Sequence, residues 1–176
     1  MGLFGSYSLK GFNISGTYSI MNSILKEPLS GDSSFKDRIY PGEQMLFIPK
    51  NAGGLTIGYG FPKLFGHSDR FYTSVNMTYT SGATAIDQVR STYDRLMNLY
   101  QANINRYGER YYNTELPSIT KLNLNVEYTI HRDLRFFMQL SNITNNTDPE
   151  YFNDFPSIGR GWMFGLKYNF TTTGNK

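Results

Sequence analysis

The chain of 176 residues contains no cysteine and only two histidines, His67 and His131. A disulfide framework and a thiolate metal site are therefore excluded, and two histidines are too few for a metal site built on imidazole. No segment approaches the roughly 18 consecutive apolar residues of a membrane-spanning helix. The 17 basic residues are scattered and leave a net charge of only +3, so the composition gives no indication of nucleic-acid binding.

Charge is scarce in this chain, while aromatic residues and glycine are abundant. Charged residues make up 18% of the sequence, whereas a soluble domain carries about a quarter. Aromatic residues reach 16%, with 14 Tyr and 13 Phe beside 17 Gly. This composition predicts a β-protein with an unusual surface. Residues 1–8 lack the basic start and apolar run of a secretory signal, so we expect either a cytosolic chain or a signal upstream of Met1.

Seven segments alternate apolar and polar residues with the period of a β-strand. They cover residues 3–9, 12–20, 55–61, 71–80, 122–130, 134–141 and 162–170. Each predicted strand has one apolar face and one mostly polar face, and no apolar face carries Asp, Glu, Lys or Arg. A soluble sandwich or lipocalin-like barrel would turn the apolar face inward, whereas a membrane barrel turns it toward lipid.

The connections between these segments alternate strictly between short and long. The short ones are expected at residues 10–11, 62–70 and 131–133, and the long ones at residues 22–53, 81–119 and 142–160. This alternation places every long loop on one rim, as in outer-membrane barrels. Aromatic residues near the strand ends fit the girdles that such barrels carry at both interfaces. These residues are Tyr18, Tyr59, Phe61, Phe71, Tyr79, Tyr128, Trp162, Tyr168 and Phe170.

The direction of the predicted strands bears on whether they form a complete barrel. The last strand follows a long loop and so runs toward the periplasm, and counting back through seven strands starts the first one outside. A complete bacterial barrel has an even number of strands and both ends in the periplasm. We therefore expect either a further strand within residues 81–119, or a C-terminal piece of a larger barrel. In that piece, residues 1–170 form the barrel segment and residues 171–176 a polar tail.

Several motifs recur here in a defined order and spacing. They are Leu116-Pro117, Leu122-Asn123-Leu124-Asn125-Val126, Leu134-Arg135-Phe136-Phe137, Ser141-Asn142-Ile143, Gly159-Arg160-Gly161 and Met163-Phe164-Gly165-Leu166-Lys167-Tyr168-Asn169-Phe170. Upstream, Pro49-Lys50 precedes Leu55-Thr56-Ile57-Gly58-Tyr59. Together these motifs resemble the C-terminal end of the TonB-dependent outer-membrane receptors, and the resemblance runs from about Gly11 to Phe170.

The resemblance implies a bacterial outer-membrane protein whose parent takes up a scarce nutrient, with a ferric siderophore as first choice and glycans or cobalamin as alternatives. It implies contacts with outer-membrane lipids and the barrel-insertion machinery, and it places Trp162, Tyr168 and Phe170 at the membrane interface and in assembly. The family's plug domain and TonB box are absent, so the TonB complex would be reached only through that missing N-terminal part. Six residues follow Phe170, although the family usually ends on the aromatic residue.

The connection 81–119 contains the strongest candidate site residues. Apolar residues recur there at helical spacing and predict a helix over residues 85–103, which we interpret as an element that packs the loop. The Arg-Tyr segment that follows suits an anionic aromatic ligand such as a catecholate siderophore. Its residues are Arg106, Tyr107, Arg110 and Tyr111. The alternative is that these side chains stabilise the loop by packing on each other.

Other constellations are weaker. The tight turn at residues 131–133 brings Arg135 diagonally opposite Glu127 and predicts an ion pair on the polar face. Calcium at Asp148, Glu150 and Asp154 is an alternative that the spacing does not favour, so we expect no metal site.

No catalytic motif is present. We therefore expect no enzyme, no cofactor and no nucleic-acid partner. A stand-alone small barrel with an adhesive or structural role and a soluble β-barrel that binds an apolar ligand are the alternative functions.

Overall fold

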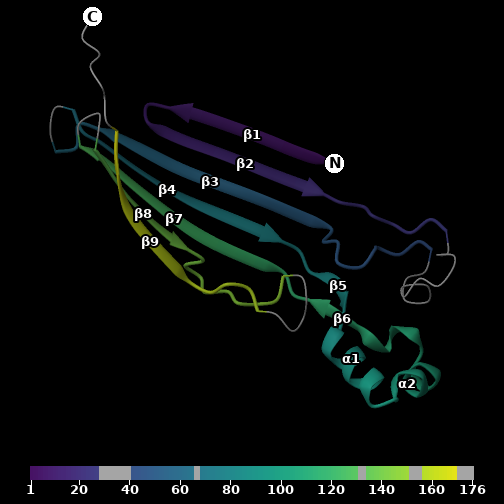
Figure 1. The fold of residues 1–176 in the computed structure, drawn as a ribbon. Coiled ribbons are helices and arrows are strands. Elements are labelled where there is room, and N and C mark those ends of the chain that lie inside the picture. Colours follow the sequence, from purple (N-terminus) through teal and green to yellow (C-terminus); the bar gives the residue numbers. More distant parts are fainter. Residues whose placement is uncertain (28–40, 66–67, 131–133, 151–155, 170–176) are drawn as a thin grey trace, which may run out of the picture.

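A computed structural model describes residues 1–27, 41–65, 68–130, 134–150 and 156–169 (Figure 1). Seven long strands form its main sheet. They are β1 (Gly2–Leu9), β2 (Phe12–Ile20), β3 (Asn51–Pro62), β4 (Arg70–Thr80), β7 (Ile119–Ile130), β8 (Leu134–Ser141) and β9 (Gly161–Tyr168). All seven strands that the alternation predicts are confirmed, with boundaries that differ by a few residues.

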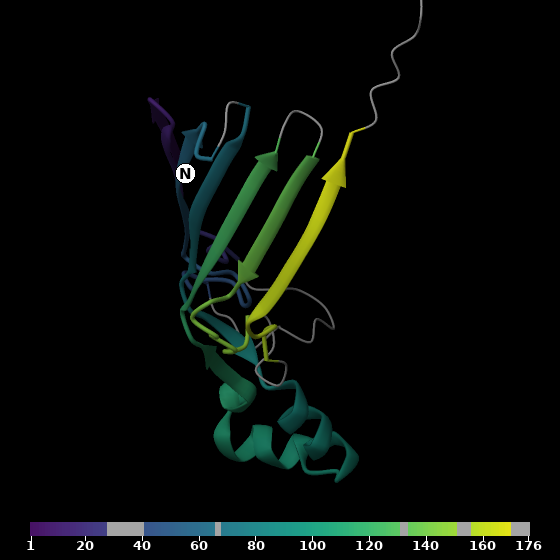
Figure 2. The ribbon, with the colours of Figure 1, turned by 90° about the vertical axis from the view of Figure 1, so that its left-hand side faces the viewer.

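The sheet is an antiparallel meander in which each long strand pairs with the next one along the chain. The order is β1-β2-β3-β4-β7-β8-β9, and the sheet is twisted and curved (Figure 2). The prediction of an antiparallel all-β framework with a helical insertion is therefore confirmed. Strands β1 and β9 are the edges of an open sheet, so closure into a barrel stays a prediction.

The register keeps the seven predicted apolar stripes on one face. Leu9 lies opposite Phe12, which lies opposite Tyr59. On the same face, toward the other edge of the sheet, Val126 lies opposite Met138, which lies opposite Phe164. Because side chains alternate between faces along a strand, this in-phase pairing assembles seven separate stripes into one continuous apolar surface.

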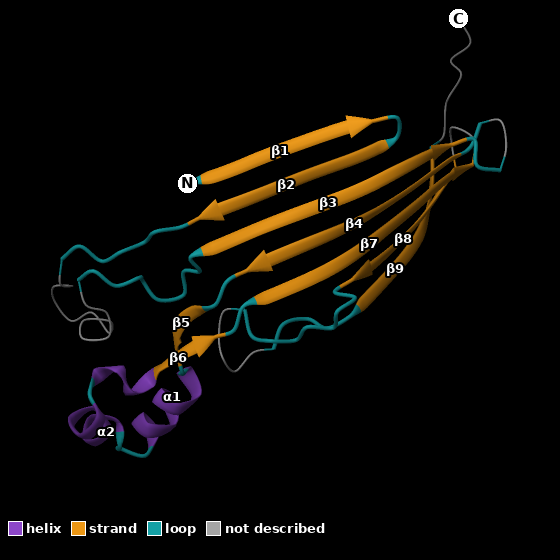
Figure 3. Cartoon of the chain, turned by 180° about the vertical axis from the view of Figure 1, so that it is seen from behind, coloured by secondary structure: helices purple, strands orange, loops and turns teal. Residues whose placement is uncertain are grey.

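The connections obey the predicted alternation. The ends of β1, β3 and β7 that lead into short connections lie at one end of the sheet, and the long connections leave from the other (Figure 3). Lys10 and Gly11 have φ of 46° and 88°, the two positive values that a two-residue hairpin turn requires. A Cβ on Gly11 would lie 2.5 Å from the carbonyl oxygen of Gly60, so only glycine fits there.

The long connection between β4 and β7 folds into an arm beyond the sheet. It comprises β5 (Ala83–Ile86), α1 (Gln88–Leu96), α2 (Tyr100–Tyr107), the 3-10 helix η1 (Glu109–Tyr112) and β6 (Asn113–Leu116). Strands β5 and β6 pair only with each other. The first of the two alternatives, a further strand of the main sheet within residues 81–119, is therefore not what the structure shows: β5 and β6 form a separate hairpin.

The predicted single helix over residues 85–103 is wrong in its extent. Its first residues belong to β5, and the helical part is broken between α1 and α2. Asn98 adopts φ of 58° at the break, a left-handed conformation that asparagine tolerates better than most residues and that an α-helix cannot contain. No helix in the described ranges has both the length and the apolar character needed to cross a membrane.

The hydrophobic core of the described residues lies in the arm and at its base, not in the sheet. Leu46 from the β2–β3 connection packs with Ile86, Ile104 and Tyr112 of the arm. The remaining buried apolar side chains are Ala85, Leu116 and Ile119. Two long connections therefore fold together into one small unit.

Candidate functional site

The apolar face of the sheet is exposed across its whole width. At one edge Leu3 is 65% exposed, and at the other Trp162 and Phe164 are 71% and 70% exposed. The central strands contribute Ile57, Val75 and Met77, which are also exposed. The paired positions on this face of the described strands include no charged residue. Exposed apolar patches of this extent are rare on soluble monomers and mark contact with another apolar phase or partner.

Aromatic rings on this face gather toward the strand ends. At the short-turn end, the ring of Phe61 lies 4.3 Å from that of Tyr59 and 5.8 Å from that of Phe71. Trp162 and Tyr168 stand near opposite ends of β9, and their assignment to membrane interfaces stays a prediction. Phe170, the predicted assembly residue, lies outside the described residues.

The polar face carries a row of side-chain hydrogen bonds that crosses the strands. The Asn76 amide donates to the Thr56 hydroxyl at 2.9 Å, and the Asn123 amide donates to the side-chain oxygen of Asn76 at 3.2 Å. The predicted pair is confirmed: an Arg135 guanidinium nitrogen lies 2.9 Å from a Glu127 carboxylate oxygen. A charge is tolerated here, whereas a charge on the opposite face would meet an apolar surface.

Two glycines on the polar face make room for aromatic side chains of the neighbouring strands. A Cβ at Gly58 would lie 2.4 Å from the Tyr72 hydroxyl, and a Cβ at Gly165 would lie 2.5 Å from the Phe137 ring. Glycine in a strand interior is otherwise unfavourable. A larger residue at either position would clash with the aromatic side chain beside it.

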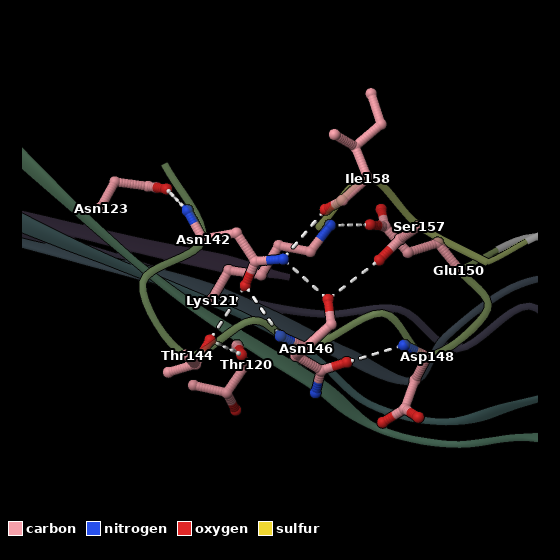
Figure 4. A network of polar contacts seen from close by, with 10 residues as sticks. All are labelled: Thr120, Lys121, Asn123, Asn142, Thr144, Asn146, Asp148, Glu150, Ser157 and Ile158. Atoms are coloured by element: carbon pink, nitrogen blue, oxygen red, sulfur yellow. Dashed lines mark hydrogen bonds and ion pairs between the residues drawn. The ribbon is translucent and has the colours of Figure 1, made fainter. Parts of the chain in front are cut away.

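A cluster of polar contacts centred on Asn142 ties the end of β8 to the long connection that follows (Figure 4). Asn142 is buried, with 3% of the residue exposed. Its side-chain amide donates to the carbonyls of Asn146 and Ile158 at 2.8 Å and 2.9 Å. Its backbone N–H donates to the Asn123 side chain at 2.8 Å, which joins this cluster to the polar row of the sheet.

The acidic residues that suggested calcium have other surroundings. Glu150 forms an ion pair with Lys121, and Asp154 lies outside the described residues. Within the part of the chain that the structure describes, no three His, Asp or Glu side chains gather in a way that could hold a metal ion.

A cavity of about 230 Å³ lies where the polar face meets the arm. Ala52, Thr80 and Ile119 line it from the sheet, Leu116 from the arm, and Glu150 from the last long connection. It is therefore the place in the described residues where the polar face, the arm and a second long connection meet.

A buried polar triad holds the arm together. The Tyr112 hydroxyl, on a fully buried residue, donates to an Asp94 carboxylate oxygen at 2.9 Å. The Asn103 amide donates to the same oxygen at 2.6 Å. Burial, together with the hydrogen bond to Asp94, raises the pKa of Tyr112 from 10.0 to about 12. Asp94 thus fixes α1 against both α2 and the return of the chain toward β6.

The arm should lose stability in strong alkali because of Tyr112. Its pKa is higher in the folded arm than in an unfolded chain, so the stabilising contribution is complete below pH 10 and is lost as the pH rises through about 12. We expect Tyr112 to titrate late in the near-ultraviolet phenolate absorbance. Tyr112→Phe should reduce the late step by the absorbance of one tyrosine and Tyr107→Phe should leave it unchanged, and a late step that keeps its full amplitude in Tyr112→Phe would contradict the assignment.

The four predicted ligand residues are partly brought together. The Arg106 guanidinium lies 5.1 Å from the Tyr107 ring centroid, and the rings of Tyr107 and Tyr111 stack at 4.8 Å. Arg110 instead forms a two-oxygen contact with Glu43 of the β2–β3 connection at 2.5 Å. Arg106, Tyr107 and Tyr111 form one surface, whereas Arg110 serves the contact between the two long connections.

Sequence reasoning missed the contribution of the β2–β3 connection to this unit. Glu43 pairs with Arg110, Leu46 enters the core, and the Phe47 N–H donates to the carbonyl of Thr84 at 2.8 Å. These contacts join residues that are about 40 to 70 positions apart along the chain. No local spacing carries that information.

Comparisons with protein-family models, curated proteins and solved structures gave no match to this chain.

Proposed function

We propose that the sheet is part of the wall of a β-barrel in a bacterial outer membrane, with its apolar face toward lipid. The observation that carries this proposal is the continuous, exposed and uncharged apolar face of the described strands. A lysine or arginine at mid-bilayer on the lipid face costs about 2–4 kcal/mol, which accounts for the exclusion of charge. Long loops at a single rim and aromatic rings toward both strand ends support the same arrangement.

In this proposal the polar face lines the interior of the barrel and the long-loop rim faces the outside of the cell. The motifs between Gly11 and Phe170 support a more specific assignment, to the C-terminal barrel segment of a TonB-dependent receptor that takes up a ferric siderophore, with glycans or cobalamin as alternative substrates. Arg106, Tyr107 and Tyr111 offer an exterior surface for an anionic aromatic ligand, because stacked phenol rings beside a guanidinium suit such a group.

The position of Trp162, the only tryptophan of the chain, allows a direct test. The protein is reconstituted in phosphatidylcholine vesicles, and the indole fluorescence is compared with that in vesicles whose acyl chains carry bromine, a contact quencher. We expect strong quenching of Trp162, because its side chain stands on the apolar face.

A matched control moves the indole by one residue. In Trp162→Phe with Met163→Trp, the indole stands on the polar face of β9, since neighbouring side chains point to opposite faces. Quenching should then be weak. Equal quenching of the two proteins would refute the membrane assignment. A chain that stays in solution without detergent and does not bind the vesicles would also refute it and would favour a soluble barrel.

A further inference from the structure

Helix α1 is amphipathic but lies with its apolar side outward. The residues that it buries are Ser91 and Asp94. Val89, Tyr93, Leu96 and Met97 are 59%, 56%, 77% and 54% exposed, and their spacing places them on one side of the helix. We call these four residues the α1 stripe. The prediction that this apolar spacing packs the loop holds for Ile86 and Tyr100, which lie in or against the core of the arm. It fails for the α1 stripe, because the triad of Asp94, Asn103 and Tyr112 turns the polar side of α1 inward.

Arginines flank the α1 stripe and are held in place by aromatic rings. The Arg95 guanidinium lies 4.4 Å from the Tyr100 ring centroid, and that of Arg90 lies 5.5 Å from the Tyr111 ring centroid. Such contacts fix a cation while its outer side stays available for hydrogen bonds. Asp94 is buried, and Asp87 caps the helix and offsets part of the charge of Arg90 at 3.5 Å. The stripe is thus an apolar strip with a cationic border in which Arg95 carries most of the net charge.

The position of the arm limits what can bind to the α1 stripe. The helices stand at the tip of the β5–β6 hairpin, beyond the end of the main sheet (Figure 1, Figure 3). Four strand residues span about 13 Å at roughly 3.3 Å per residue, so the stripe lies well outside the band of the sheet's apolar face. A lipid surface that covers that face would not reach the stripe. A second copy would bring the same arginine border against its own, which is electrostatically unfavourable.

We propose that the α1 stripe docks into an apolar groove on a separate protein, and that acidic side chains border this groove. Anchors at i, i+4, i+7 and i+8 on one side of a helix are the pattern of helix-in-groove recognition. Arg90 and Arg95 meet the acidic border and set the direction of the helix in the groove. The exclusion of a lipid occupant rests on the proposed lipid-facing sheet, whereas the apolar spacing and the arginines belong to the arm alone.

Site-specific photo-cross-linking of the full chain, in the cells that produce it, tests the proposal. A photoreactive phenylalanine derivative replaces Tyr93 on the stripe or, as a control, Gln101, an exposed residue of α2. We expect position 93 and not position 101 to cross-link to one protein, with the attachment points inside an apolar groove bordered by Asp or Glu. Attachment to lipid, to a second copy, to another part of the same chain or to nothing would overturn the proposal.

Charge reversal then tests the predicted border. The double variant Arg90→Glu with Arg95→Glu should lower the cross-link yield about tenfold or more, while Lys63→Glu, a charge reversal at an exposed residue at the short-turn end of the sheet, should leave it unchanged. Lysine substitutions at the acidic border of the partner should restore the yield. If the double variant fails to fold, Leu96→Ser tests the stripe without a change of charge, at a position that is 77% exposed. It should also lower the cross-link yield. A yield insensitive to all of these changes overturns the proposal.

Discussion

Val75→Arg should prevent stable folding of the sheet in a lipid bilayer. Val75 lies near the middle of β4, is 45% exposed and stands opposite Ile57 and Leu124 on the apolar face. If this face contacts lipid, an arginine there costs about 2–4 kcal/mol, a large part of the stability of a small protein. If the same face were a solvated surface, the substitution would change the stability by about 0.5 kcal/mol or less.

The matched control is Thr78→Arg, three residues along the same strand. Thr78 is exposed on the polar face and lies opposite Gly54 and Lys121. Urea titration of the protein in phosphatidylcholine vesicles, monitored through Trp162, gives the free energy of unfolding of both variants. We expect a large loss for Val75→Arg and a small one for Thr78→Arg. Comparable losses, or the opposite order, would contradict a lipid-facing apolar surface.

The main sheet could be predicted because its determinants are local. Alternation of apolar and polar residues with period two specifies each strand and the face that it turns to each side. The Lys10-Gly11 turn adopts two positive φ values that fix the β1–β2 register. The connection of only three residues between β7 and β8 likewise leaves Thr129 opposite Arg135, and this places Arg135 within reach of Glu127. Short connections leave few alternatives for pairing, so the order of the strands follows from the chain itself.

The arm could not be predicted because its determinants are distant in the sequence. The apolar spacing of α1 indicates a buried stripe, yet hydrogen bonds from Tyr112 and Asn103 turn Asp94 inward and the stripe outward. Local propensity does not reveal that a buried carboxylate has two donors from other elements. Leu46 and Glu43 enter the same unit from a different connection. The sequence places Arg106, Tyr107 and Tyr111 near one another along the chain, whereas it does not reveal that Arg110 joins two connections through Glu43.

Asn142→Ala should destabilise the long-loop end of β8 and β9 by about 3–5 kcal/mol. Asn142 makes four side-chain hydrogen bonds: it donates to the carbonyls of Asn146 and Ile158 and accepts from the Thr144 hydroxyl and the Asn146 N–H. Each contributes about 1 kcal/mol, and partners left buried cost more. The residue also adopts φ of 48°, a conformation that costs alanine about a further 1 kcal/mol.

Two other substitutions at Asn142 separate these effects. Asn142→Gly keeps the backbone conformation without strain, so it should recover about 1 kcal/mol relative to alanine while all four side-chain bonds stay lost. Asn142→Asp keeps the two acceptor contacts but turns a charged oxygen toward the carbonyls of Asn146 and Ile158. Since the neutral carboxyl can donate to a carbonyl and the carboxylate cannot, this variant should gain stability as the pH falls.

Urea unfolding in vesicles, combined with hydrogen exchange of the amides at residues 143–146, measures these changes. Exchange should increase most at the Asn146 amide, which donates to the Asn142 side chain. Ser157→Ala is the control, because its hydroxyl also binds the Asn146 carbonyl but is one contact of the cluster rather than its centre. If Asn142→Ala cost no more than Ser157→Ala, the cluster would not stabilise this end of the sheet. A much larger loss for Asn142→Ala than for Ser157→Ala would show that Asn142 couples the polar face, through Asn123, to the long connection after β8.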